Sequence, residues 1–481
     1  MLPPSRAAWF ASTNSILHCV CCLAAAALIA GANHGLAADI IEEHQEIAGP
    51  FENGVDVTLT CLECHADAAQ DFMRTTHWTW EKHQEVPGKG LISLGKKNAI
   101  NNFCIGIASN WVYCSSCHAG YGWKDASFDF SNPENIDCLV CHDTSGDYVK
   151  SHTDAGMDMP GLDLERIAQG VGPTTRQSCG TCHFFGGGGH NVKHGDLTTS
   201  LIAPNRDFDV HMGVDGLNYT CTDCHKAERH LLKGHAMAVS PGGDNPAACT
   251  QCHEEQPHGK KVLDLHSGTV ACQACHVPAF AKTFPTQLSW DWSTAGKDHD
   301  EVKDKYGKEA YTRKKGHFTW GKDVRPGYYA WYNGKTGVYT AGDKIDVDAV
   351  TRLNWPLGSR DDPDARIYPF KVHRGKQIYD VNTRYLIVPQ LYGPGGFEET
   401  EDWYSAAASG MKAAGLPFSG QYDFAETVIY LPINHMVALA RKALKCKECH
   451  ARGGGRLDWE ALGYTGDPLR VKGLARNPMR K

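Results

Sequence analysis

The chain has 481 residues, of which 20 are cysteine and 25 are histidine. Cysteine use at this level exceeds what the packing of a globular domain requires, so chemistry has to account for it. The formal net charge is −7 with histidine neutral, which argues against nucleic acid as a partner.

The N-terminus has the pattern of a secretory signal peptide. Arg6 precedes an apolar stretch from Ser15 to Gly31, and small residues follow up to Ala37 and Ala38. We therefore predict that residues 1–38 are a signal peptide, cleaved near Ala37 or Ala38, that directs the protein to the periplasm. An uncleaved membrane anchor is the alternative. No other run is long and apolar enough to span a bilayer, so no transmembrane segment is expected in the mature chain.

The mature chain contains eight complete Cys-x-x-Cys-His motifs. In such a motif the two sulfurs form thioether bonds to a porphyrin and the adjacent histidine ligates the iron, whereas zinc sites and disulfide frameworks need no trailing histidine. We therefore predict eight covalently attached haems c. The attachment residues are Cys61, Cys64 and His65; Cys114, Cys117 and His118; Cys138, Cys141 and His142; Cys179, Cys182 and His183; Cys221, Cys224 and His225; Cys249, Cys252 and His253; Cys272, Cys275 and His276; and Cys446, Cys449 and His450.

Seven of the motifs fall in residues 39–280, which we take as a haem-rich region. So many haems leave little room for a core of side chains, and the buried macrocycles would supply much of the folding free energy. The expected fold is that of a multihaem cytochrome c: mainly short α-helices and long loops wrapped around a packed haem stack, with a few short β-hairpins. Electron transfer is the minimal function of such a stack.

The segment between Val277 and Lys445 has no cysteine but holds 13 of the 18 tyrosines and 6 of the 12 tryptophans. Aromatic or branched residues alternate with turn formers at 327–332, 337–340 and 377–388, which predicts short hairpins. We take residues 281–433 as an aromatic-rich, haem-free cover over the haem stack.

The C-terminal region, residues 434–481, carries the eighth motif. An Ala/Leu-rich pattern from Asn434 to Glu448 predicts a helix that leads into this motif, and glycines at 453–455 end it. The basic tail after them is either a solvated terminus or a docking strand.

The sixth iron ligand decides between a relay and an enzyme. A relay cytochrome has two protein ligands on every iron, whereas an enzyme keeps one displaceable position. The number of histidines is sufficient to give all eight irons a second histidine ligand. Fifteen remain outside the motifs and the signal peptide: His44, His77, His83, His152, His190, His194, His211, His230, His235, His258, His266, His299, His317, His373 and His435.

Several segments resemble the octahaem tetrathionate reductases, which are related to hydroxylamine oxidoreductases and pentahaem nitrite reductases. The resemblance covers most of the mature chain, including the order and spacing of the motifs. Its carriers are CLECH at 61–65 followed by His77-Trp78, FCIG with Cys104, CHFFGGGG at 182–189 followed by Val192-Lys193-His194-Gly195-Asp196, CTDCH at 221–225, and Asn434-His435-Met436.

The resemblance implies that the second haem, on His118, is catalytic and that Lys193 is its distal ligand, with Lys150 as the alternative. It also places Cys104 in the same pocket. His190 stands where the family has an acidic residue, which leaves the charge around the site open. For the other seven haems the resemblance assigns the distal ligands to His77, His194, His211, His230, His258, His266 and His435.

On this resemblance we expect a periplasmic reductase that receives electrons from a periplasmic or membrane-associated donor. Its substrate would be small and anionic: tetrathionate, reduced to thiosulfate, is the first candidate, and nitrite or hydroxylamine are competitors. Two alternatives remain, a relay cytochrome whose haems are all saturated and an oxidase like hydroxylamine oxidoreductase. None of the eight motifs has the Cys-x-x-Cys-Lys form that octahaem nitrite reductases usually carry.

Overall fold

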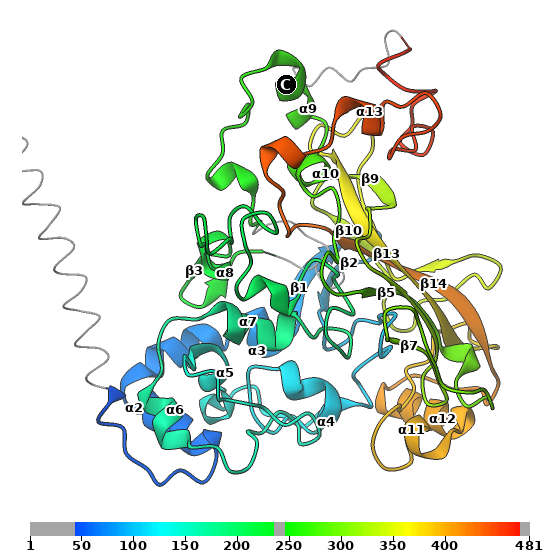
Figure 1. Cartoon of the computed structure of the whole chain (residues 1–481). Helices are drawn as coiled ribbons and strands as arrows, with labels where there is room; N and C mark the ends of the chain where they lie inside the picture. Colours follow the sequence, from blue (N-terminus) through cyan, green and yellow to red (C-terminus); the bar gives the residue numbers. More distant parts are fainter. Residues whose placement is uncertain (1–43, 235–245, 472–481) are drawn as a thin grey trace, which may run out of the picture.

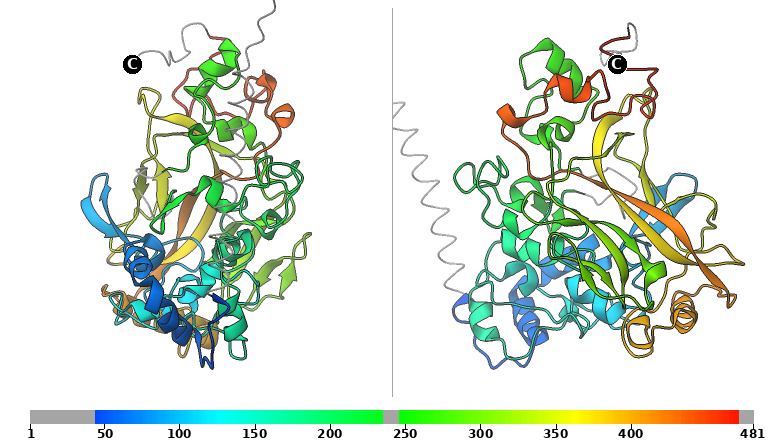
Figure 2. Two further views of the ribbon diagram at one scale, coloured as in Figure 1. Left: turned by 90° about the vertical axis from the view of Figure 1, so that its left-hand side faces the viewer. Right: turned by 45° about the vertical axis from the view of Figure 1, so that its right-hand side comes forward.

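The computed structural model describes residues 44–234 and 246–471 (Figure 1). The predicted signal peptide, His235 and the end of the basic tail lie outside the described residues. Short helices and loops fill one side of the molecule, and the long strands β13 (Arg366–Asp380) and β14 (Tyr422–Pro432) run along the other (Figures 1 and 2). In the described ranges, no helix has both the length and the apolar character to cross a membrane.

Every motif lies on a helical turn. On such a turn, positions i, i+3 and i+4 share one face, so both sulfurs and the imidazole point to the same side. The longest of these helices, α2, begins with a capping box at Asn53. The helices in and around the motifs are α2 (Gly54–Phe72), α3 (Thr76–Thr79), α4 (Trp111–Cys114), α5 (Leu139–His142), α6 (Leu164–Gln169), α7 (Arg176–His183), α8 (Cys221–Cys224), α9 (Lys261–Ser267), α10 (Cys272–His276) and α13 (Cys446–Cys449), while Cys249–Gln251 is a 3₁₀ turn.

The predicted cover forms an eight-stranded mixed sheet, which is more extensive than a few hairpins. Its order is β11-β14-β13-β5-β8-β7-β6, with β9 also paired to β13. The remaining strands form three two-stranded sheets, β1-β2, β3-β4 and β10-β12. Besides β13 and β14, the strands are β1 (Lys82–Val86), β2 (Gly90–Leu94), β3 (Ala227–Glu228), β4 (Leu231–Leu232), β5 (Thr286–Asp291), β6 (Val302–Lys303), β7 (Glu309–Thr312), β8 (Gly316–Gly321), β9 (Tyr328–Tyr332), β10 (Thr336–Val338), β11 (Thr351–Arg352) and β12 (Asn354–Pro356).

Strand pairing between distant segments explains the size of this sheet. β13 pairs antiparallel with β14 from Phe370 opposite Pro432 to Asp380 opposite Tyr422, and it pairs in parallel with β5. β13 is buried along most of its length, as a strand covered on both faces would be. Local hairpin patterns cannot predict the parallel pairs, because a parallel pair needs a long crossover.

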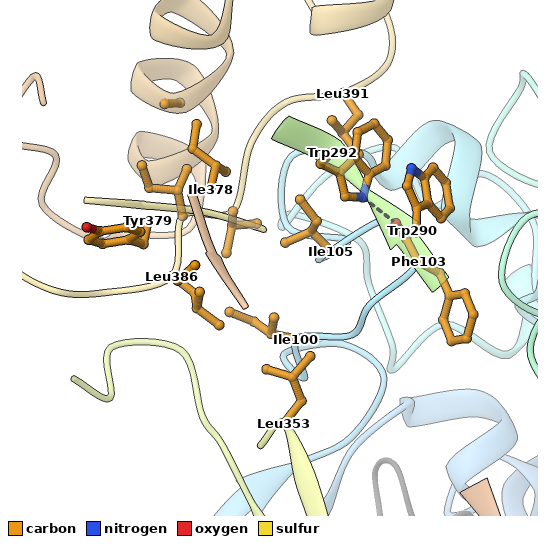
Figure 3. Packing of buried hydrophobic residues seen from close by; sticks show 14 of the residues in the cluster. Ile100, Phe103, Ile105, Trp290, Trp292, Leu353, Ile378, Tyr379, Leu386 and Leu391 are labelled. Carbon is orange, nitrogen blue, oxygen red and sulfur yellow. Dashed lines mark hydrogen bonds between the residues drawn. The ribbon is translucent and has the colours of Figure 1, made fainter. Parts of the chain in front are cut away.

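The largest hydrophobic core packs the sheet against the loop around residues 100–105 (Figure 3). Ile100, Phe103 and Ile105 from this loop lie among Trp290 and Trp292 of the sheet side. Trp292 Nε1 donates to the carbonyl of Phe103 at 3.0 Å. The core therefore fixes the backbone on both sides of Cys104.

The C-terminal region corrects one expectation. The predicted helix from Asn434 to Glu448 is absent, and the segment holds only a 3₁₀ turn at Ala440–Lys442 before α13. Its backbone N–H groups form hydrogen bonds with another segment of the chain. Ala438 N donates to the carbonyl of His276, and Leu444 N donates to the carbonyl of Cys275. The Ala/Leu-rich segment is thus held extended against the seventh motif, and tertiary hydrogen bonds override its helical propensity.

Close backbone packing gives a stability prediction at α12 (Trp403–Ala413), which follows α11 (Phe397–Thr400). A Cβ on Gly410 would lie 1.9 Å from the carbonyl oxygen of Val388, so Gly410→Ala should displace the helix and destabilise the protein by about 1–3 kcal/mol. Chemical denaturation followed by backbone circular dichroism measures this. Gly327→Ala is the matched control, because a Cβ there meets no atom within 4 Å; equal midpoints for the two variants would contradict the packing argument.

Candidate active site

The motif cysteines are free to attach a ligand, because all seventeen cysteines of the described ranges are unpaired. Cysteines from different motifs also lie side by side. Cys61 neighbours Cys138, Cys117 neighbours Cys182, Cys179 neighbours Cys221, and Cys249 neighbours Cys272. Weaker electrostatic contacts join Cys141 to Cys179, Cys224 to Cys252, and Cys275 to Cys449. The motifs therefore form one connected series in space, with the second motif joined at the fourth.

Seven motif histidines each face one other histidine. Two imidazoles that share one metal, with each nitrogen about 2 Å from it, have ring centres about 6 Å apart. The observed pairs match this spacing: His44 with His65 (6.1 Å), His77 with His183 (6.2 Å), His142 with His230 (6.4 Å), His211 with His253 (6.0 Å), His225 with His435 (6.2 Å), His258 with His276 (6.3 Å) and His266 with His450 (6.3 Å).

A separation of about 6 Å between two histidine rings does not by itself indicate a haem site, but the composition of the seven pairs does. His299 and His317 are also 6.0 Å apart, yet neither belongs to a motif. Each of the seven pairs instead joins one motif histidine to one histidine from another part of the chain. These residues fit an iron held between two imidazoles, and six of the seven partners are the distal ligands expected from the sequence.

The geometry favours His44 in place of His194. His44 stacks against His65 with an interplanar angle of 27°. His194 is partly buried beside Lys193 and Asp196, and burial lowers its pKa well below the usual histidine value. Only a count of histidines could have suggested His44, since it precedes His65 by twenty-one positions and belongs to no motif.

His118 differs from the other motif histidines, because no histidine faces it among the described residues. Its ring is enclosed by aromatic side chains, with Trp78 at 5.1 Å, Trp80 at 5.4 Å and Trp123 at 4.8 Å between ring centroids. Its Nε2 lies 2.6 Å from the carbonyl oxygen of Trp78, and its Nδ1 is buried without a partner. Burial lowers the pKa of His118 to about 3, so the ring stays neutral and keeps a lone pair for a metal.

Of the two lysine candidates for the second haem, Lys150 is already engaged. Its Nζ donates to Asp137 Oδ2 at 2.6 Å, to the carbonyl of His118 at 2.9 Å and to that of Gly120 at 3.0 Å. Three bonds use all three N–H groups of an ammonium. Lys150 therefore supports the backbone of the second motif and has no lone pair to offer.

Lys193 is available. Within the described ranges, no hydrogen bond or ion pair joins the ammonium of Lys193 to another side chain. The backbone carbonyl of Lys193 accepts a hydrogen bond from Lys371 on β13. Burial, followed by repulsion from Lys96, lowers the pKa of Lys193 to about 8. Keeping the amine neutral at pH 7 then costs about 1 kcal/mol instead of about 5 kcal/mol for an ordinary lysine. The site thus removes most of the cost of ligation by lysine.

The glycine-rich segment 186–189 packs against both Lys193 and Cys104. A Cβ on Gly187 would come within 3.2 Å of Lys193 Cβ, and one on Gly188 would lie 3.5 Å from Cys104 Sγ. Gly187 and Gly188 also have positive φ angles, which only glycine adopts readily. Cys104 lies within electrostatic reach of Cys114, so Cys104 adjoins the second motif as expected from the sequence.

Cys104 is a protonated thiol at neutral pH, because burial raises its pKa. Its Sγ lies 3.4 Å from the hydroxyl of Tyr392, which the sequence did not single out. His190, in contrast, is occupied elsewhere: its Nε2 accepts from the backbone N–H of Thr199 at 3.1 Å, and its ring packs on Phe284. The structure places Lys193 and Cys104 each against the glycine-rich segment 186–189 and gives His190 a local structural contact.

Comparisons with known proteins find a chain of known structure that is similar over most of this chain. A crystal structure of octaheme cytochrome c from Shewanella oneidensis superposes with a TM-score of 0.85 and 50% identity, over 89% of this chain and 98% of that chain. Residues 287–453 match the family model described as "Cytochrome c bacterial". An uncharacterized protein from Archaeoglobus fulgidus is 26% identical in an alignment of 221 residues that covers 36% of this chain and 73% of that protein.

Proposed function

Because the chain belongs to the octahaem c-type cytochromes and carries eight covalently attached haems c, we propose that it is a periplasmic reductase with a single active site at the second haem. Electron transfer itself follows from family membership. The single observation that supports a catalytic site at the second haem is that no histidine faces His118 among the described residues. The periplasmic location is supported by the signal-peptide pattern of residues 1–38.

The seven histidine pairs would saturate seven irons, and Lys193 would complete the eighth opposite His118. When bound, the haems supply one-electron carriers and one iron at which a substrate can replace a weak ligand. Lys193 suits that place, since its amine competes with a proton at neutral pH and an imidazole does not. Once displaced, its ammonium is a cation beside the site.

A second cation favours a substrate with two negative charges. The ammonium of Lys96 lies 3.8 Å from the centre of the Trp80 ring and interacts electrostatically with Lys193, Cys104 and His118. Two lysines within electrostatic reach of each other match the charge of tetrathionate better than that of nitrite, and hydroxylamine is neutral. Two electrons cleave the central S–S bond of tetrathionate and release two thiosulfates, with no proton consumed.

Cys104 takes a lining role in this proposal. Thiol–disulfide exchange with tetrathionate would require the thiolate, which burial of Cys104 disfavours. The bound haem would supply the electrons, while Lys193 and Lys96 would hold the terminal oxygens of the substrate. The donor of the electrons would be a periplasmic or membrane-associated redox protein.

Electron paramagnetic resonance of the oxidised eight-haem protein, with and without cyanide or nitrite, tests the proposal. We expect one haem in eight to bind the added ligand and its signal to change in Lys193→Ala. Tetrathionate, nitrite and hydroxylamine should then be assayed side by side. Eight low-spin haems that bind nothing in either protein would reject the enzyme and leave a relay cytochrome, while a preference for hydroxylamine oxidation would reverse the direction of catalysis.

A further inference from the structure

A buried lysine from the haem-free sheet holds the backbone of Lys193. Lys371 lies on β13 and is only 1% exposed. Its Nζ donates to the carbonyl of Val192 at 2.8 Å, to the carbonyl of Lys193 at 2.8 Å and to Thr286 Oγ1 at 2.6 Å. The Lys371 side chain therefore binds the carbonyls of two consecutive residues that lie 179 and 178 positions away in the sequence.

The direction of each hydrogen bond in this cluster is defined. Thr286 Oγ1 donates to the carbonyl of Asn191 at 2.7 Å, so it can only accept from Lys371. All three partners of Lys371 are thus acceptors, which matches an ammonium with three N–H groups. Because every donor of the buried group is used, removing the side chain would leave carbonyls of the 191–193 segment without their partners.

The segment 191–193, whose carbonyls these hydrogen bonds hold, lies between glycines. The glycine-rich residues 186–189 precede it, and Gly195, with φ of +86°, follows it. A Cβ on Gly195 would come within 2.7 Å of the Phe280 ring, so the chain passes close to the cover there. Asp196 anchors the far end, because its Oδ2 accepts from the backbone N–H groups of Asn434 and His435. Lys371 and Thr286 provide the anchor at the near end.

We propose that Lys371 is a positioning residue that fixes the Lys193 backbone so that the Lys193 amine can serve as a ligand of the haem attached at the second motif. The inference rests on the proposed ligation by Lys193 and deepens it. It also gives the haem-free sheet a part in the active site, since β13 and β5 together supply the anchor while the motif-rich region supplies His118. Lys371 would act through the backbone of Lys193.

Lys371→Met in the eight-haem protein is the test, and Lys282→Met is the matched control. Lys282 is a partly buried lysine whose ammonium, like that of Lys371, donates to two carbonyls, those of Phe208 at 2.9 Å and Met436 at 3.0 Å. Neither carbonyl belongs to the segment around Lys193. The readouts are the electron paramagnetic resonance signal of the lysine-ligated haem, the cyanide dissociation constant and the midpoint of thermal unfolding.

We expect Lys371→Met to convert much of the lysine-ligated signal to a high-spin form. Cyanide should then bind about tenfold more tightly or better, since the loss of hydrogen bonds from a charged donor shifts an equilibrium by such a factor. Lys282→Met should leave both readouts unchanged even if it lowers the thermal midpoint. Equal spectra for Lys371→Met, Lys282→Met and the unmodified protein would overturn the inference.

Two further variants keep the outcome decisive. If Lys371→Met does not fold, Thr286→Val removes the third partner of Lys371 while keeping a similar shape, and it should weaken the lysine-ligated signal in the same direction; an unchanged signal would overturn the inference. Lys193→Ala separates the two proposals. If Lys193→Ala leaves the spectrum unchanged, ligation by Lys193 itself fails, whereas a change in Lys193→Ala without one in Lys371→Met rejects only the positioning role.

Discussion

Replacing Lys193 by alanine should lower kcat/KM for tetrathionate by about 10–100-fold, because a hydrogen bond from a charged donor to an anion contributes about 1.5–3 kcal/mol. Two effects oppose each other in this variant. The iron loses a ligand that the substrate must displace, which favours binding, but the pocket loses one of its two cations. For a dianion the loss of the charge should dominate, since the lysine ligand is already weak: burial lowers the pKa of Lys193 only to about 8, so a proton still competes at neutral pH.

The charge of the substrate separates the two effects. With neutral hydroxylamine the lost cation matters little, so its kcat/KM should change far less than that of tetrathionate or should rise. Steady-state assays of both substrates on one preparation measure this, with Lys412→Ala on α12 as a control for an unrelated lysine. Equal losses for both substrates would show that Lys193 does not act through its charge, and unchanged kinetics for both would remove Lys193 from the site.

The sequence predicted the haem sites residue by residue because the attachment chemistry is local. Two sulfurs three positions apart with a histidine beside them need only one helical turn, and each motif is found on such a turn. Covalent haem and the fold class of a multihaem cytochrome are confirmed by the similarity to the octaheme cytochrome c of known structure. The distal partners are not local, and their geometry could be proposed only after the chain was folded.

His44 and His194 illustrate what sequence could not supply. His44 belongs to no motif, whereas His194 lies in a segment that carries the resemblance. The choice between them depends on which one meets His65 across the fold. Lys150 and Lys193 were likewise alternatives until hydrogen bonds separated them. The contacts of Lys150 with Asp137 and of Lys371 with Val192 join segments that no periodic pattern connects.

The haem-free segment was the least predictable part of the fold. Its aromatic and branched residues indicated strands, but the parallel pairing of β5 with β13 and of β11 with β14 depends on partners far along the chain. The Ala/Leu-rich pattern before the last motif predicted a helix that does not form, because Ala438 and Leu444 bond to the seventh motif instead. Propensity decided neither case; long-range hydrogen bonds did.

Asp137→Leu should destabilise the protein by about 3–5 kcal/mol, the usual cost of removing one partner from a buried ion pair. Asp137 and Lys150 are almost fully buried, with 0% and 2% of their side chains exposed and 2.6 Å between Oδ2 and Nζ. Asp137 also accepts from the hydroxyls of Tyr121 and Tyr148 and from Val140 N. The variant would leave the Lys150 ammonium in the interior without a counter-charge, next to the backbone of His118.

A double-mutant cycle distinguishes the ion pair from ordinary packing. Asp137→Leu/Lys150→Met should regain much of the stability lost in Asp137→Leu, because no uncompensated charge remains. Asp154→Ala, which removes the exposed partner of Lys124 at 3.4 Å, should change stability by only about 0.5 kcal/mol or less. Denaturation followed by circular dichroism and by the Soret band gives the midpoints. Strictly additive losses in the double variant would mean that Asp137 stabilises the second motif through its tyrosine and backbone contacts and that its charge is not needed there.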